Sequence, residues 1–116
     1  RFGASIHVLE DYRLTQAPWN RDHCRSVDPL LYHYQGFRPI GREEVMLWYG
    51  FPVRDPTAWD RIYRPYLACF VAAQQRLDAA GIAIPQARYH PLKRLKARWW
   101  HAPRGYSRIV PFGAGV

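Results

Sequence analysis

The sequence of 116 residues has little cysteine and no long apolar run, and each absence excludes a class of protein. Its two cysteines, Cys24 and Cys69, are too few for a disulfide scaffold and lack Cys-x-x-Cys spacing, which indicates a reducing compartment. No apolar run of roughly 18 residues occurs, so the sequence predicts no membrane-spanning helix. No charged region followed by an apolar segment opens the chain, as it does in a secretion signal. We therefore expect a cytoplasmic protein.

Acidic side chains are absent from the last third of the chain. No Asp or Glu follows Asp78, whereas seven cations do, so this part supplies most of the net charge of +8. Apolar residues make up 48% of the sequence and aromatic residues 16%, which argues against disorder. We divide the chain into residues 1–87, a folded portion, and residues 88–116, a basic aromatic tail.

Hydrophobic periodicity and turn residues predict an α+β fold in which short strands are followed by two or three helices, with many loops. Residues 29–34 begin with apolar side chains on both faces, which is typical of a central strand. The expected elements are strands at 5–9, 29–34 and 107–110, a loop at 13–28, helices at 42–50, 55–81 (divided at Pro65) and 92–103, and an extended segment at 82–91. The expected core consists of Leu31, Val45, Leu47, Trp48, Leu67, Phe70, Val71 and Leu77.

An unusual combination of residues occurs at 30–41, LLYHYQGFRPIG, where an apolar run leads into a histidine, a glycine and a cation. His33 is of a metal-binding residue type, Gly36 permits close approach of a ligand to the backbone, and Arg38 presents a planar fork that suits phosphate oxygens. A lone histidine is more often a core or surface residue, and that alternative stays open here. Together the three residues indicate a metal–diphosphate site.

The segment YHYQGFRPI resembles the C-terminal signature of family 8 glycosyltransferases, H-x-x-G-x-x-K-P-W. His33 and Gly36 match it in type and spacing, and Pro39 follows a cation as in the family. The segment is one residue shorter than the signature, Arg38 replaces lysine, and Ile40 stands where tryptophan is expected. Upstream, QAPWNRDHC resembles the Trp-Asn segment that precedes the histidine strand in these transferases.

The resemblance implies that the chain is the C-terminal portion of a GT-A transferase, which moves a sugar from a nucleotide-sugar donor to a glycan or lipid-linked acceptor. His33 would complete the coordination of Mn²⁺ or another divalent cation, and Arg38 with Gly36 would contact the donor diphosphate. Trp19 and Asn20 would line the site; the alternative is a packed indole and a turn-forming amide. No D-x-D motif and no Gly-rich phosphate loop occurs in the sequence, so we expect the chain alone to be inactive.

The basic tail contains a short segment that is amphipathic as a helix. Leu92, Leu95 and Trp99 share one face, and cations lie away from it, which suits the headgroup region of an anionic membrane. The resembled family includes bacterial lipo-oligosaccharide galactosyltransferases with a similar tail, which implies attachment at the inner membrane face. Two alternatives are a helix packed onto the domain and a nucleic-acid-binding module without catalytic activity. The residues expected to bind a membrane or polyanion are Lys93, Arg94, Lys96, Arg98, Trp99 and Trp100.

Overall fold

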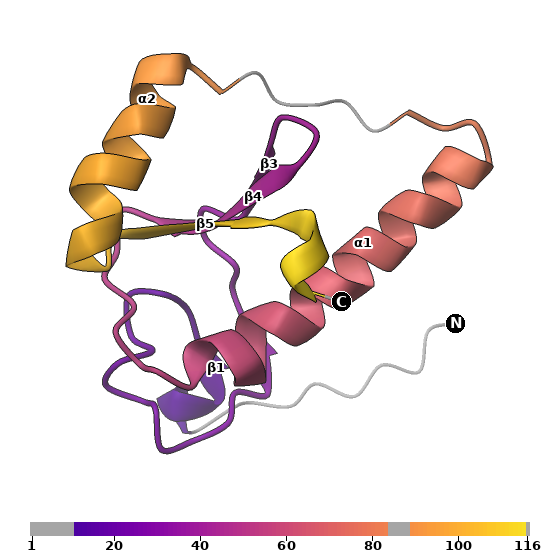
Figure 1. Cartoon of the computed structure of the whole chain (residues 1–116). Helices are drawn as coiled ribbons and strands as arrows, with labels where there is room; N and C mark the ends of the chain where they lie inside the picture. The colour runs from indigo at the N-terminus through magenta and orange to yellow at the C-terminus, as the bar shows by residue number, and fades with distance from the viewer. Residues whose placement is uncertain (1–10, 84–88, 116) are drawn as a thin grey trace, which may run out of the picture.

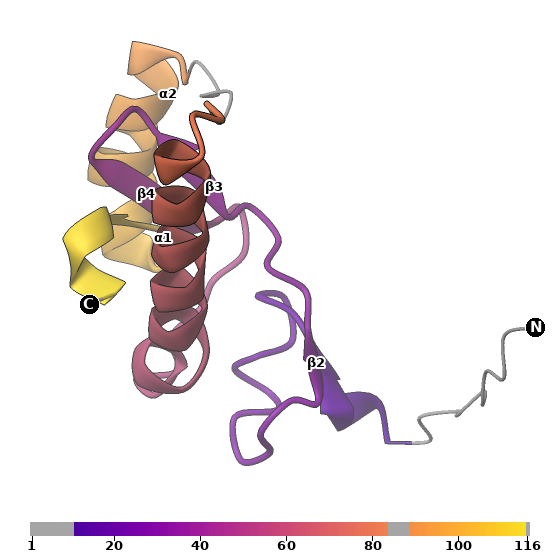
Figure 2. The same ribbon diagram turned by 90° about the vertical axis from the view of Figure 1, so that its right-hand side faces the viewer.

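The computed structural model describes residues 11–83 and 89–115, and their fold is α+β, as predicted. A three-stranded antiparallel sheet has β4 (Glu44–Tyr49) in the middle, between β3 (Arg38–Ile40) and β5 (Ser107–Pro111). Two helical segments lie on opposite faces of this sheet (Figures 1 and 2). One is α1 (Arg64–Ala79), and the other begins with α2 (Pro91–Leu95) and continues as a π-helical segment at Lys96–His101.

The predicted helix at 42–50 is wrong, because these residues form β4 and the turn that precedes it. Val45 to Trp48 are all buried, and Val45 pairs with Val110 of β5. A strand whose two faces are both covered by helices needs apolar side chains at consecutive positions, and this run supplies them. The helix prediction rested on Glu43 and Glu44 at the start of the segment, but Glu44 is paired with arginines of the C-terminal helix.

The helical region predicted from Asp55 is confirmed, and it divides next to Pro65. Asp55 accepts a hydrogen bond from the backbone N–H of Thr57 at 3.0 Å, as a helix-capping carboxylate does. A π-helical segment at Trp59–Tyr63 precedes α1, and Pro65, which lacks an N–H, stands in the first turn of α1.

The predicted core is confirmed for residues near the sheet and wrong for two others. Val45, Leu47, Trp48 and Leu67 are buried, and Phe70 and Val71 are partly buried. Leu77 is 36% exposed, because the C-terminal half of α1 extends past the sheet (Figure 1). Leu31 is 60% exposed.

The segment before the sheet, residues 11–35, extends to one side of the helices and strands (Figure 2). Here β1 (Thr15–Gln16) pairs in parallel with β2 (Leu31–Tyr32), so the segment predicted as a long loop contains a short strand. The prediction of a central strand at 29–34 is wrong, since β2 is one strand of a two-stranded sheet. The strand predicted at 5–9 lies outside the described residues, as does part of the extended segment at 82–91.

The tail belongs to the same folded unit as the rest of the described chain. The helix predicted at 92–103 and the strand predicted at 107–110 are both present, and β5 completes the sheet. Ala97 is buried against Ile40 and Met46, and the hydroxyl of Ser107 donates a hydrogen bond to the carbonyl oxygen of Ala97. Short 3-10 turns complete the described structure at Tyr12–Leu14, Ala102–Arg104 and Phe112–Gly115.

Candidate functional site

A buried ion pair fixes the loop that carries Trp19 and Asn20. The side chains of Arg21 and Asp55 are 0% and 2% exposed, and the Arg21 Nε atom donates to a carboxylate oxygen of Asp55 at 2.7 Å. Arg21 also donates to the side-chain oxygen of Gln16 at 2.8 Å and to the carbonyl oxygen of Val27 at 3.2 Å. Arg21 therefore joins the loop to Asp55, at the start of the helical region, and also to Gln16 and Val27, which lie before and after Arg21 in the same segment. No sequence pattern indicates this role, because arginine is rarely buried.

An aromatic corner, which we define as Trp19, His33 and Phe51, lies where this loop meets the end of β2. The ring of Trp19 contacts the ring of His33 edge to face, with centroids 5.5 Å apart, and lies 5.5 Å from the ring of Phe51. The backbone N–H of His33 donates to the carbonyl oxygen of Gln16 at 2.8 Å, which continues the pairing of β1 with β2. His33 is exposed and Trp19 is 47% exposed, so both rings are accessible at the surface.

Asn20 and Gly36 have structural partners in this region. The side-chain oxygen of Asn20 accepts from the backbone N–H of Ala17 at 2.8 Å, which is the turn-forming alternative considered for this residue. Gly36 has a φ of +83°, and a Cβ atom there would lie 2.6 Å from the backbone nitrogen of Tyr49. The close approach that glycine permits at this turn is therefore to β4. Contacts of Asn20 or Gly36 with a donor stay predictions.

A divalent cation was predicted at His33, and the described residues do not make a complete site for one. Among residues 11–83 and 89–115, no group of three or more His, Cys, Asp or Glu side chains is placed to hold a metal ion. Mn²⁺ favours oxygen-rich octahedral coordination, and His33 offers a single nitrogen. We therefore derive no step through a metal held by these residues alone.

Arg38, the predicted diphosphate contact, lies with the tail. Its side chain is on β3, and the guanidinium carbon is 5.8 Å from the centre of the Tyr89 ring. It lines a hollow together with Lys93 and Lys96, whereas His33 faces Trp19. The structure thus brings Trp19 to His33 and brings Arg38 to two lysines of the C-terminal helix.

Two of the four predicted membrane-binding cations are held by a carboxylate. Glu44 on β4 pairs with Arg94 and with Arg98, the latter at 2.6 Å. Burial by itself would raise the pKa of Glu44, but hydrogen bonds from the two guanidinium groups outweigh it and lower the pKa below its ordinary value. These pairs hold the C-terminal helix to the sheet.

The apolar face predicted for the tail helix is turned to solvent. Leu92, Leu95, Trp99 and Trp100 are 69%, 53%, 74% and 57% exposed. The alternative in which Leu and Trp side chains pack this helix onto the domain is therefore wrong for these four residues. Within the described ranges, no helix has the length and apolar character needed to cross a membrane.

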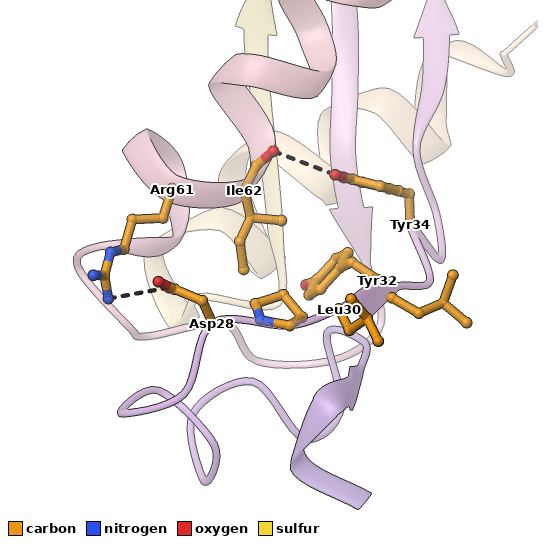
Figure 3. A pocket seen from close by; sticks show the side chains of 8 residues that line it. Asp28, Leu30, Tyr32, Tyr34, Arg61 and Ile62 are labelled. Atoms are coloured by element: carbon orange, nitrogen blue, oxygen red, sulfur yellow. Dashed lines mark hydrogen bonds and ion pairs between the residues drawn. The ribbon is translucent and has the colours of Figure 1, made fainter. Parts of the chain in front are cut away.

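Figure 3 shows a further hollow, of about 500 Å³, between residues 28–34 and the π-helical segment that precedes α1. An ion pair between Arg61 and Asp28, at 3.3 Å, lies at its edge. The hydroxyl groups of Tyr32 and Tyr63 are hydrogen-bonded at 2.9 Å. Burial raises the pKa of Tyr32 to about 12 and also raises the pKa of Tyr63, so both hydroxyls are protonated at neutral pH. The hydrogen bond between these tyrosines joins β2 to the π-helical segment, and neither hydroxyl supplies a general base.

No protein-family model matches this sequence, and no curated protein or solved structure matches it either.

Proposed function

We propose that the chain is the C-terminal part of a metal-dependent glycosyltransferase that transfers a sugar from a nucleotide-sugar to a glycan or lipid-linked acceptor. The observation that supports this most is the contact between Trp19 and His33. These residues come from the two separate segments that resemble the transferase family, and the fold places their rings against each other.

In the proposed enzyme His33 is the one metal ligand that this chain contributes. The other ligands, and the nucleotide-binding sheet, belong to a preceding donor-binding half that contains a D-x-D motif. A divalent cation bound there would neutralise the charge of the donor diphosphate. Trp19 contacts the His33 ring edge to face and, with Phe51, supplies an apolar surface beside it.

Donor binding by the complete polypeptide that carries this chain tests the proposal. Nucleotide-sugars are titrated by calorimetry, with Mn²⁺ and with a chelator, on the parent protein and on His33→Ala. We expect Mn²⁺-dependent binding that His33→Ala weakens by about tenfold or more, as loss of a metal ligand requires. His23→Ala removes another exposed histidine and is the matched control. Equal affinities for the two variants, or no donor binding by the parent, contradict the proposal.

The tail is proposed to attach this enzyme to an anionic membrane surface. The support is the exposure of Trp99 and Trp100 beside Lys93 and Lys96, since indoles and cations together favour the membrane interface. Binding to anionic vesicles that survives added salt is expected, because salt screens the cations but leaves apolar burial in place.

The alternative is a nucleic-acid-binding module, for which a different salt response is expected. Such a module loses affinity steeply with salt as counterions are released, and it does not depend on His33. One face of Trp100 is already covered by the guanidinium group of Arg104, 4.1 Å from the ring, which leaves less surface for base stacking. Oligonucleotide binding measured at low and high salt separates the two functions.

A further inference from the structure

A small cationic hollow lies between the sheet and the C-terminal helix. It has a volume of about 250 Å³, and Arg38, Lys93 and Lys96 supply three cations to its lining. Lys93 and Lys96 are three residues apart on the helix and so lie on the same side of it. They are the only lysines in the sequence. Among the described residues, no ion pair involves any of these three cations.

Two tyrosines complete the lining of this hollow, Tyr49 from β4 and Tyr89 from the residues just before α2. Burial raises the pKa of Tyr89, and the nearby charge of Arg38 only partly opposes this, so the phenol keeps its proton at neutral pH. A protonated phenol can donate a hydrogen bond to an anion. Three cations and a phenol donor around one small space favour a doubly charged anion over a singly charged one.

A second hollow, of about 370 Å³, adjoins the first, because Tyr89 lines both. Its other lining residues are Pro91, Leu95 and Trp99, together with Arg94 and Arg98, which are paired with Glu44. Leu95 and Trp99 are 53% and 74% exposed. Exposed apolar side chains grouped in this way indicate a binding surface for an apolar group. The cationic hollow is smaller than the roughly 300–1,000 Å³ of sites for drug-sized ligands, so it suits a single phosphate group.

We propose that the two hollows together bind a phosphorylated amphiphile, namely a membrane lipid whose head group is a phosphate monoester. The phosphate lies among Arg38, Lys93 and Lys96, and the adjoining apolar part of the lipid contacts Leu95 and Trp99. This inference rests on the proposed membrane attachment of the tail and adds head-group selectivity to it. It does not depend on transferase activity or on His33.

Vesicle cosedimentation of the full chain tests the selectivity. Neutral phosphatidylcholine vesicles carry either phosphatidic acid or phosphatidylserine, with the two amounts adjusted to equal surface charge. We expect at least about fivefold tighter binding to phosphatidic acid, equivalent to one additional cation–phosphate contact. Lys93→Gln/Lys96→Gln should weaken that binding by about 30-fold, while Arg25→Gln/Arg76→Gln, which removes the same charge elsewhere on the surface, should weaken it by less than about threefold.

Equal affinity for phosphatidic acid and phosphatidylserine vesicles, with the same loss of affinity in both double variants, overturns the phosphate site. That result remains compatible with membrane attachment of the tail. No vesicle binding at all overturns both. Single-stranded oligonucleotides that displace the protein from phosphatidic acid vesicles at equal phosphate concentration overturn the lipid assignment in favour of nucleic acid.

Lysine signals distinguish a lipid head group from a free phosphate. Reductive ¹³C-methylation keeps the lysine charge and labels only Lys93, Lys96 and the terminal amine, so each signal is resolved by NMR. We expect both lysine signals to shift with short-chain phosphatidic acid at a much lower concentration than with inorganic phosphate or glycerol phosphate. Saturation by the water-soluble phosphates at the same concentration contradicts the amphiphile.

Discussion

Replacing Arg21 with methionine should destabilise the protein more than any other single loss of charge among the described ion pairs. The substitution preserves most of the side-chain volume but removes the hydrogen bonds to Asp55, Gln16, Val27 and Thr57. It also leaves the Asp55 carboxylate, 2% exposed, without its cation. Breaking a buried pair in this way costs about 3–5 kcal/mol, a large part of the 5–15 kcal/mol by which a small domain is stable.

Thermal unfolding followed by circular dichroism measures this loss. Arg21→Met should lower the Tm by roughly 15 °C. The matched control is Arg13→Met, which removes an ion pair with Asp11 of similar length, 2.7 Å, but with both side chains well exposed, and it should leave the Tm unchanged. Asp55→Asn added to Arg21→Met should restore part of the stability, because the unpaired charge is then gone. Equal Tm values for Arg21→Met and Arg13→Met would show that the buried ion pair contributes no more stability than the exposed one.

Three further outcomes are expected. Gly36→Ala should lower the free energy of unfolding by about 2 kcal/mol or more in a denaturant titration, since its φ is +83° and the new Cβ would lie 2.6 Å from the Tyr49 nitrogen; wild-type stability would contradict the described turn. Glu44→Gln should speed amide hydrogen exchange in the C-terminal helix and leave α1 unchanged, and equal changes in both would contradict the anchoring role of the ion pairs. The pKa values of Asp55 and Glu44 are lowered from 3.8 and 4.5, so their stabilisation is complete above about pH 4.5 and is lost as the pH falls through the lowered values. A Tm that stays constant from pH 6 to pH 3 would contradict this.

The parts of the fold that could be predicted from sequence are those specified by local pattern. Helix α1 is followed by Gly81, and helix α2 begins at Pro91. In both cases the residues that mark the helix end lie close in sequence to apolar residues with helical spacing. The strand β5 contains two adjacent β-branched residues, Ile109 and Val110, and begins two residues after Gly105. In contrast, the sequence pattern wrongly predicts a helix at β4, because Glu43 and Glu44 resemble a helix start and Gly50 resembles a helix end. The pairing of β4 with β5 joins residues far apart in the chain, which no local pattern indicates.

In the candidate site, too, contacts between residues far apart in the chain could not be predicted from local sequence pattern. The family resemblance predicts that Trp19 and His33 belong to one site, and in the structure their rings are in contact. Arg38 meets Lys93 and Lys96 only after β3 and the C-terminal helix pack together, which no local pattern indicates. The buried Arg21 could not be distinguished in sequence from the other arginines, because burial depends on Asp55, which lies 34 residues away.

The most direct measurement of the proposed function is paramagnetic broadening of histidine signals in the complete polypeptide. The five histidines of this chain are assigned by NMR through single substitutions, and a nucleoside diphosphate is added with Mg²⁺ or with Mn²⁺. The proposal predicts that Mn²⁺ broadens the His33 signal more strongly than the signals of the other four histidines, because paramagnetic broadening falls steeply with distance from the ion. A His33 signal that stays sharp while Mn²⁺ and the nucleotide are bound would contradict the assignment of His33 as a metal ligand.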